Sequence, residues 1–361
     1  MRAMLLTRIS LLDDGGKDTC RDRVSTGVYV TTITGPLVFN DLPVPQPGSE
    51  DILIKVSACG ICHTELDQIE GRIAPPKLPV VPGHQVAGVV AQTGRNVTKF
   101  KKGDMAGATW FFSSCGKCRF CINGQENLCD EFKATGCHAD GGYAEYMVIS
   151  ETSACRIPPS FKDLCSAAPL MCAGVVGWRS VKLAGMENSK TLGLYGFGSA
   201  NHIVLQTANW LYPDSKKFVI TRNPEERKLA IRLGADWAGD IEDVTPQKLD
   251  CIIDTTPVWK PVIFALGNLQ KGGRLVMNLI RKEEKDKQYL QDLDYAKHLW
   301  LEKEVKSVAN VTSRDAEEFL EIAAKAKIRP HIRIFSLEEA NAALYELKSG
   351  KFAGSKVLHI N

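Results

Sequence analysis

The chain has 361 residues, of which 44% are hydrophobic, and its 45 basic and 42 acidic residues leave a net charge of +3. This length is sufficient for two domains, each with its own core. The near-neutral balance, with no basic run interleaved with aromatic residues, argues against nucleic acid or an anionic membrane as partner and favours a small-molecule substrate.

The start of the chain bears on location. No apolar run approaches the ~18 residues of a membrane span, and the opening MRAMLLTRISLLDD, interrupted by Arg8, is too short for a secretory signal. We therefore expect a cytoplasmic protein with no membrane partner. Twelve cysteines in such a chain favour reduced thiols and metal ligation over a disulfide framework.

Residues 1 to about 170 contain short β-type runs separated by Gly and Pro, which predicts an all-β unit. The runs are YVTTITG, DILIKVSACG, VAGVVAQTG and GGYAEYMVI. The charged, Gly-rich stretch 10–25 is interpreted as a surface loop.

Four cysteines lie within the segment CGKCRFCINGQENLC, separated by two, two and seven residues. This spacing indicates one tetrahedral zinc ion bound by Cys115, Cys118, Cys121 and Cys129. Disulfides or unrelated buried thiols are the alternative. Because four protein ligands leave no open position, this zinc would stabilise a loop and take no part in a reaction.

From about residue 190, strand-type and helix-type segments alternate, which predicts a parallel sheet. TLGLYGF precedes ANHIVLQTANWLY, KKFVITR precedes PEERKLAIRLGA, and LDCIIDTT precedes GGRLVMNLI. Asn223 is a predicted helix N-cap. Near the C-terminus, Ser336 and Glu339 have the spacing of a capping box, and a last strand, KVLHI, follows that helix.

The segment LGLYGFGSANHIVLQ places two glycines between a strand and a helix, the context of a dinucleotide-binding turn. Gly196 would permit the tight turn, and Gly198 would let the backbone approach the pyrophosphate. Asn201 stands in place of the third glycine, so the motif alone leaves open a turn without ligand. The surrounding βαβ order favours a cofactor site formed by Gly196, Phe197, Gly198, Ser199 and Ala200.

The end of the second strand distinguishes the two nicotinamide cofactors. There a carboxylate bonds the ribose 2′-hydroxyl of NAD, whereas a guanidinium can hold the 2′-phosphate of NADP through two parallel hydrogen bonds. This strand ends with Thr221 and Arg222 and has no acid at its tip. The sequence therefore favours NADP(H) over NAD(H), with a solvated Arg222 as the alternative.

Three further segments each place a soft or imidazole ligand beside glycine: CGICHTEL, VPGHQVAG and PLMCAGVVGW. With the four-cysteine segment and the glycine turn, in this order, they resemble the zinc-dependent alcohol dehydrogenases of the medium-chain dehydrogenase/reductase superfamily over nearly the whole chain. The resemblance implies an α/β protein with a GroES-like β-rich catalytic domain (1–172 and 311–361) and a Rossmann doubly wound parallel-sheet domain (173–310). It places cofactor and substrate in the cleft between them.

The resemblance also implies a second, catalytic zinc, bound by Cys62, His84 and Cys172, for two zinc ions per chain. Three protein ligands leave a fourth position where an alcohol can bind and lose its proton before hydride passes to the nicotinamide. In the reverse direction the metal would polarise the carbonyl of an aldehyde or ketone.

Four more residues match positions of the family. Thr64 matches the hydroxyl that receives the alcohol proton, and Glu65 matches the carboxylate that orients the histidine ligand. His63 matches a basic residue near the cofactor phosphates, and Trp110 matches an aromatic residue of the substrate pocket. An ordinary turn threonine, a loop histidine and a core tryptophan are the alternatives.

Two positions depart from the family. Asp67 replaces the histidine that passes the proton to solvent in many relatives, so we expect Thr64 and a ribose hydroxyl to deliver it to Asp67 or directly to water. Gln85 replaces the usual glutamate after the histidine ligand. With one negative charge fewer nearby, the zinc would be a stronger Lewis acid.

The sequence therefore predicts an enzyme that interconverts alcohols and aldehydes or ketones with NAD(P), as a homodimer or homotetramer. A polyol dehydrogenase and a catalytically silent zinc-binding relative are the alternatives. The presence of all three ligands of the implied catalytic zinc, Cys62, His84 and Cys172, argues against the silent relative. The remaining cysteines need be no more than small buried apolar residues: Cys20, Cys137, Cys155, Cys165 and Cys251.

Overall fold

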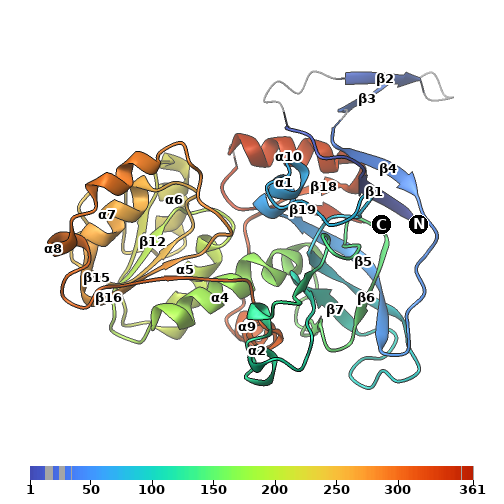
Figure 1. Cartoon of the computed structure of the whole chain (residues 1–361), viewed down its shortest axis with the longest axis horizontal. Coiled ribbons are helices and arrows are strands. Elements are labelled where there is room, and N and C mark those ends of the chain that lie inside the picture. Colours follow the sequence, from blue (N-terminus) through green and yellow to red (C-terminus); the bar gives the residue numbers. More distant parts are fainter. Residues whose placement is uncertain (13–18, 24–28, 34, 351, 361) are drawn as a thin grey trace. The chain divides into compact units, whose positions relative to one another are not determined.

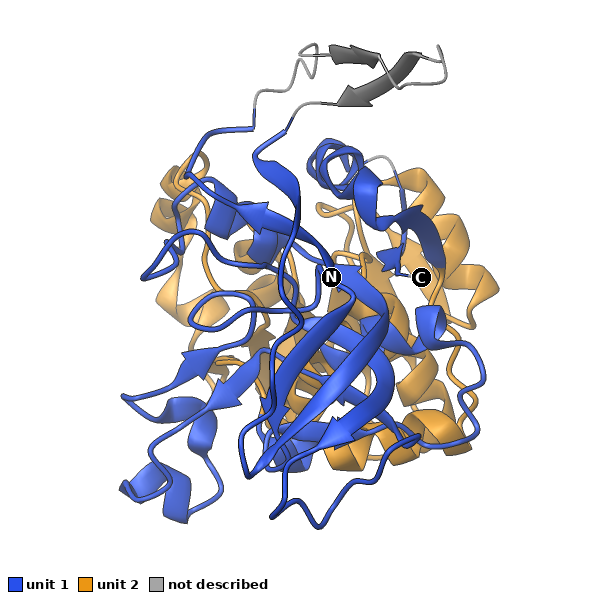
Figure 2. Cartoon of the chain, turned by 90° about the vertical axis from the view of Figure 1, so that its right-hand side faces the viewer, with its two compact units in different colours: residues 1–172, 312–316, 332–361 blue, residues 173–311, 317–331 orange. Residues whose placement is uncertain are grey.

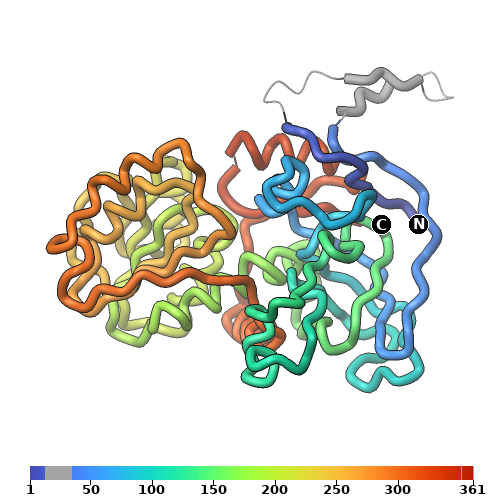
Figure 3. Tube along the Cα trace, in the orientation of Figure 1, coloured from blue at the N-terminus to red at the C-terminus, as the bar shows by residue number. Residues whose placement is uncertain are grey.

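The computed structural model describes residues 1–12, 19–23, 29–33, 35–350 and 352–360. The chain forms two compact units (Figure 2). Unit 1 comprises Met1–Cys172, Thr312–Ala316 and Ile332–Asn361, and unit 2 comprises Ala173–Val311 and Glu317–His331. Both ends of the chain belong to unit 1, and Figure 3 traces the chain between them from blue to red. Of residues 311–361, which were predicted to belong to the first domain, Val311 and Glu317–His331 lie in unit 2.

The main sheet of unit 1 is built around one long strand, β5 (Asp51–Ile61), which pairs antiparallel with β6, β10 and β19 (Figure 1). The sheet order is β11-β7-β6-β5-β19-β18, with β10 also on β5. The other strands are β6 (Gln85–Thr93), β7 (Met105–Ala108), β10 (Tyr146–Ser150), β11 (Ala154–Arg156), β18 (Ile332–Ser336) and β19 (Ser355–His359). Only β18 and β19 pair in parallel. The predicted β-rich character of this region is confirmed.

Three two-stranded ribbons complete the strands of unit 1. They are β1 (Arg2–Leu6) with β4 (Leu37–Asp41), β2 (Thr19–Arg23) with β3 (Tyr29–Ile33), and β8 (Phe111–Ser113) with β9 (Lys133–Ala134). The predicted surface loop at 10–25 is therefore wrong for residues 19–23. Strand pairing uses backbone groups, which a charged composition does not remove. Residues 13–18 and 24–25 of that prediction lie outside the described residues.

The helices of unit 1 are short. They are α1 (His63–Ile69), α2 (Arg119–Ile122), α3 (Leu164–Ala167) and α10 (Ala340–Ser349), with 3₁₀ turns η1 (Glu126–Leu128), η2 (Ala168–Met171) and η4 (Leu337–Glu339). The predicted capping box of Ser336 and Glu339 is present before α10, although the first turn is 3₁₀.

Unit 2 contains a sheet of six parallel strands in the order β14-β13-β12-β15-β16-β17. They are β12 (Leu192–Tyr195), β13 (Lys217–Ile220), β14 (Trp237–Gly239), β15 (Leu249–Asp254), β16 (Leu269–Met277) and β17 (Glu304–Ser307). The predicted parallel sheet is confirmed. The strand order reverses between β12 and β15, and ligands of such sheets bind beyond the carboxyl ends at this switch point.

The helices of unit 2 alternate with these strands. They are α4 (Ala173–Ala184), α5 (Asn201–Leu211), α6 (Pro224–Arg232), α7 (Lys260–Asn268) and α8 (Tyr295–His298), with η3 (Lys287–Asp292); α9 (Ser313–Lys325) begins in unit 1. Asn223 caps α6 as predicted, since its Oδ1 accepts the Glu225 N–H at 2.9 Å.

The eleven cysteines whose side chains are described are free thiols. Cys137, Cys155, Cys165 and Cys251 are buried as predicted, and the side chain of Cys20 lies outside the description.

Over the described ranges, no single helix is both long enough and apolar enough to cross a membrane. One pair of helices bent by 42°, Leu164–Met171 with Ala173–Ala184, together has the length and composition of a span and no other feature that indicates one.

Candidate active site

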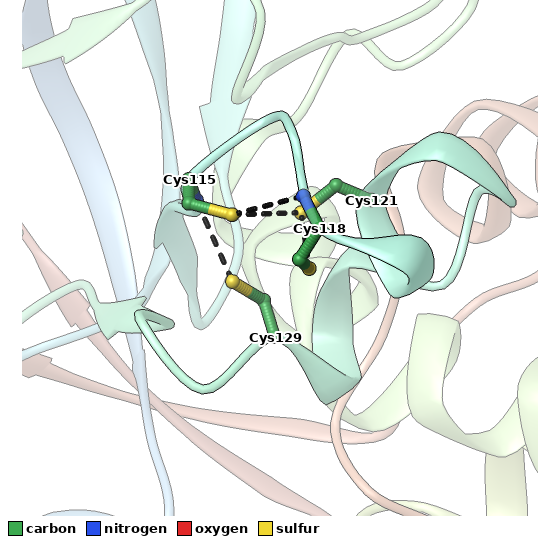
Figure 4. Close-up of side chains that lie close together, drawn as sticks. All are labelled: Cys115, Cys118, Cys121 and Cys129. Carbon is green, nitrogen blue, oxygen red and sulfur yellow. Dashed lines mark hydrogen bonds between the residues drawn. The ribbon is translucent and has the colours of Figure 1, made fainter.

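The four cysteines predicted to bind a structural metal converge on one point (Figure 4). The sulfur of Cys121 lies 3.5 Å from that of Cys118 and 3.9 Å from that of Cys115. A tetrahedral zinc with Zn–S bonds of about 2.3 Å separates its sulfur ligands by roughly 3.8 Å. A disulfide would require about 2.05 Å. The spacing of the thiols therefore fits one tetrahedral ion and not a pair of disulfides.

In the four-cysteine lobe, residues 115–129, backbone N–H groups donate hydrogen bonds to the cysteine sulfur atoms. The Cys118 N–H donates to the sulfur of Cys115 at 3.3 Å, and the Cys115 N–H donates to the sulfur of Cys129 at 3.5 Å. Hydrogen bonds from the backbone of Lys117 and Cys118 lower the pKa of the Cys115 thiol to about 7. A zinc ligand must be a thiolate, so this backbone favours the form that binds metal.

The three predicted ligands of the catalytic zinc also come together within unit 1. The ligand atoms of Cys62, His84 and Cys172 all lie within 4.8 Å of one another. His84 is 1% exposed, whereas both cysteines are partly exposed. Two soft thiols and an imidazole form a donor set that suits zinc, and they leave the fourth tetrahedral position for solvent or substrate.

Local structure positions each of these ligands. Cys62 is the N-cap of α1, where its sulfur accepts the Thr64 N–H at 3.4 Å and its N–H donates to Glu65 Oε2 at 2.8 Å. His84 immediately precedes β6, and Cys172 ends η2. Ligands distant in sequence are thus held by a helix start, a strand start and a helix end.

A buried carboxylate holds the histidine ligand. His84 Nδ1 and Glu65 Oε1 lie 2.6 Å apart, and Glu65 is 0% exposed. With Nδ1–H donated to Glu65, Nε2 is left to bind a metal. The rings of Trp110 and His84 pack edge to face, with centroids 4.9 Å apart and 80° between the ring planes.

A metal ion bound by Cys62, His84 and Cys172 would displace protons from these side chains. Burial opposes a charge on His84, but Glu65 and Cys62 raise its pKa to about 10. The hydrogen bond from Cys172, followed by contacts with His84, lowers the pKa of Cys62 well below its usual value. A proton on the His84 ring therefore competes with a metal ion for that ring nitrogen. Zinc would take the place of that proton, so its affinity falls as the pH falls.

The predicted proton relay is only partly assembled around this cluster. Thr64 Oγ1 lies 3.4 Å from the sulfur of Cys62. Asp67 is buried, but Arg72 Nε donates to its Oδ1 at 2.5 Å, a partner that the sequence analysis missed. His63 is exposed on the first turn of α1.

The glycine turn of unit 2 joins β12 to α5. Gly196 has a φ of +75°, and a Cβ there would lie 2.9 Å from Thr255 Oγ1, so only glycine fits. A Cβ on Gly198 would meet no heavy atom within 4 Å. The turn therefore meets the backbone requirements of a dinucleotide site and is open at Gly198.

The two residues predicted to select between the cofactors, Thr221 and Arg222, directly follow β13. Arg222 is exposed there, whereas the Thr221 hydroxyl donates to Glu226 Oε2 at 2.5 Å. Arg227 is bound to the Thr221 carbonyl at 2.6 Å and to Asp240 at 3.2 Å. Among the described basic residues beside this tip, Arg227 is thus held by protein partners, whereas the side chain of Arg222 is exposed.

Sequence reasoning also missed a buried ion pair at the end of β15. Lys282 Nζ lies 2.5 Å from Asp254 Oδ2 and also donates to the carbonyls of Thr256 and Val258. Asp254 is 0% exposed, and burial raises its pKa despite the charge of Lys282. A lysine in a polar segment gives no sequence signal for such a partner 28 residues away.

Comparison with known proteins gives consistent results. Residues 48–159 match the model of the alcohol dehydrogenase GroES-like domain. The chain is 38% identical over 332 residues to the probable alcohol dehydrogenase AdhA of Mycobacterium tuberculosis (strain CDC 1551 / Oshkosh), covering 91% of this chain and 94% of that protein. It is 32% identical over 355 residues to the NAD-dependent alcohol dehydrogenase of Sulfolobus acidocaldarius, covering 90% and 96%. A solved cinnamyl alcohol dehydrogenase from Sorghum bicolor matches with a TM-score of 0.81 and 27% identity, over 99% of this chain and 97% of that one.

Proposed function

Because the chain belongs to the zinc-type alcohol dehydrogenases of the medium-chain dehydrogenase/reductase superfamily, we propose that it interconverts alcohols and aldehydes at Cys62, His84 and Cys172. The convergence of these three ligand atoms within 4.8 Å carries this assignment. We further propose two zinc ions per chain, the second bound by the four-cysteine lobe.

Cys62, His84 and Cys172 would hold a zinc ion that would supply Lewis acidity, and a bound nicotinamide would supply or accept the hydride. The chain supplies the positioning. Glu65 fixes the ring of His84, and Trp110 covers one side of that ring. The Thr64 hydroxyl, beside Cys62, is placed to accept the alcohol proton.

The proposed function is tested by assaying the zinc-loaded full chain for NADPH and NADH oxidation with aliphatic, branched and aromatic aldehydes, and for polyol oxidation. We expect turnover of aldehydes. Turnover of polyols alone would support the polyol dehydrogenase alternative. Bound zinc without turnover of any substrate would indicate a silent relative and overturn the proposal.

We propose that the relay from Thr64 ends in water, because Arg72 already holds the carboxylate of Asp67. Replacing Thr64 with valine, which keeps the shape but removes the hydroxyl, is expected to lower kcat about 100-fold. Asp67→Asn is expected to leave the pH dependence of kcat unchanged. Stopped-flow rates between pH 6 and 10 measure both, and a shifted pH profile in Asp67→Asn would instead make Asp67 the proton acceptor.

We propose a preference for NADP(H), supported by the exposed Arg222 at the tip of β13. Arg222→Ala is expected to raise KM for NADPH about tenfold and to leave KM for NADH unchanged, because only NADPH carries the 2′-phosphate. Arg232→Ala, which removes an exposed arginine from the last turn of α6, is the matched control. A wild-type chain that prefers NADH, or equal effects on both cofactors, would contradict the preference.

We also propose a homodimer or homotetramer. Tyr295, Trp300, Leu301 and Val305 are each at least 44% exposed in and before β17, the last strand of its sheet. Exposed aromatic side chains beside an open strand edge favour association. A cytoplasmic location and the absence of nucleic-acid or membrane partners stay predictions.

A further inference from the structure

Two consecutive side chains at the start of α5 hold the carbonyl groups of the glycine turn. Asn201 Nδ2 donates to the Gly196 carbonyl at 2.8 Å, and His202 Nδ1 lies 3.0 Å from the Gly198 carbonyl. Both side chains belong to residues that are 0% exposed. Both glycine carbonyls therefore have partners inside unit 2.

The amide of Asn201 also reaches the neighbouring strand. Its Nδ2 lies 3.1 Å from the Tyr195 carbonyl, 3.2 Å from Thr255 Oγ1 and 3.4 Å from the Ile253 carbonyl. One amide nitrogen has two hydrogens, so these acceptors share them. A single buried side chain thus links the carboxyl ends of β12 and β15, the two strands between which the sheet order reverses.

The oxygen of the same side chain has no hydrogen-bond partner among the residues that the structure describes. Asn201 Oδ1 is one of the buried, unpaired polar atoms of the described residues. Such an atom normally accepts a hydrogen bond from ordered water or from a ligand. Asn201 Oδ1, at the start of α5, is therefore a buried hydrogen-bond acceptor to which no described residue donates.

His202 is held in one tautomer. Its Nε2 accepts the His331 N–H at 3.1 Å, so the proton lies on Nδ1 and is donated to the Gly198 carbonyl. Burial lowers the pKa of His202 to about 4, so the ring is neutral at neutral pH. The ring therefore acts as a fixed donor toward the turn.

Holding these two carbonyls also orients the peptide N–H groups. In a trans peptide the C=O and N–H groups point in opposite directions. With the Gly196 and Gly198 carbonyls bonded inward, the N–H groups of Phe197 and Ser199 point the other way. An anion at a helix N-terminus requires N–H groups facing it and carbonyl lone pairs facing away.

We propose that Asn201 and His202 are positioning residues that orient the peptides of the glycine turn toward the pyrophosphate of the dinucleotide. The inference rests on the proposed function. A third glycine at position 201 would leave the Gly196 carbonyl to a water molecule, whereas Asn201 provides a bonded amide. At the position of the third glycine, Asn201 thus adds hydrogen bonds to the turn that a glycine could not make.

The test compares Asn201→Ala with Thr207→Ala in the zinc-loaded full chain. Thr207 is a matched control because it is 1% exposed on the same helix and its hydroxyl donates to the Ile203 carbonyl at 2.9 Å. Fluorescence titration measures the Kd for NADPH and NADH. Steady-state rates, zinc content and Tm are measured in parallel.

Asn201→Ala is expected to raise both dinucleotide Kd values about tenfold, with zinc content and kcat at saturating dinucleotide close to wild type. Thr207→Ala is expected to lower Tm without changing either Kd. Asn201→Gly, which leaves room for water, is expected to regain part of the affinity.

An unchanged Kd in Asn201→Ala, or equal losses in Asn201→Ala and Thr207→Ala, would overturn the inference alone. If Asn201→Ala does not fold, Asn201→Gly serves as the test variant. A Kd for both dinucleotides equal to wild type in Asn201→Gly would also overturn the inference. A wild-type chain that binds neither dinucleotide would instead refute the proposed function.

Discussion

Replacing Cys172 with alanine is expected to lower kcat/KM for alcohol oxidation by at least about 1,000-fold, a loss of about 4 kcal/mol of transition-state stabilisation. The remaining ligands, Cys62 and His84, are too few to hold zinc against solvent. Elemental analysis should therefore show zinc falling from two ions to one per chain. Cys172 directly follows the last residue of η2, so its replacement should leave that turn intact. Circular dichroism should therefore show that the fold is retained.

Cys165→Ala is the control for this variant. Cys165 is buried on α3, three residues before η2 begins, and belongs to neither cysteine cluster of the described residues. We expect two zinc ions and nearly full activity. Two bound zinc ions in Cys172→Ala, or more than about a tenth of wild-type activity, would remove Cys172 from the catalytic site.

Replacing Cys118 with alanine is expected to affect stability instead of chemistry. A structural zinc contributes its binding free energy to folding, so the segment 115–129 should lose its local structure when the ion is lost. A loss of about 3 kcal/mol would lower Tm by roughly 6–12 °C in a domain of this size. Zinc should again fall to one ion per chain, whereas kcat measured at low temperature should stay within about threefold of wild type.

Limited proteolysis and Tm measure this prediction directly. New cleavage should occur between residues 115 and 129 in Cys118→Ala but not in Cys137→Ala, which removes a buried thiol packed near Trp110. Cys118→Ala with two zinc ions and an unchanged Tm would show that the four thiols hold no structural metal. A lower Tm with nearly unchanged kcat in Cys118→Ala, and a lower kcat with the fold retained in Cys172→Ala, would assign a structural role to one ion and a catalytic role to the other.

The regular elements were predictable because their signals are local. Alternating apolar runs predicted β5 and β6, and the cap at Asn223 predicted α6, since each depends on residues close in sequence. The strand at residues 19–23 was missed because its charged composition resembles a loop, whereas strand pairing depends on backbone groups.

The site was predictable in its residue types but not in its contacts. The spacing of the four cysteines alone indicated one ion, whereas Cys62, His84 and Cys172 are far apart in sequence and were grouped by resemblance to a family. The bond from Arg72 to Asp67 depends on the loop after α1, and the bonds of Asn201 depend on how two strands end side by side. Such contacts arise from tertiary structure and leave no pattern in the sequence.

The most direct measurement is anomalous X-ray diffraction at the zinc absorption edge from crystals of the full chain. We predict two peaks per chain, one inside the four-cysteine lobe and one within about 2.0–2.3 Å of Cys62 Sγ, His84 Nε2 and Cys172 Sγ, with a non-protein fourth ligand. A single peak in the lobe, with Cys62 and Cys172 binding no metal, would contradict the proposed catalytic centre.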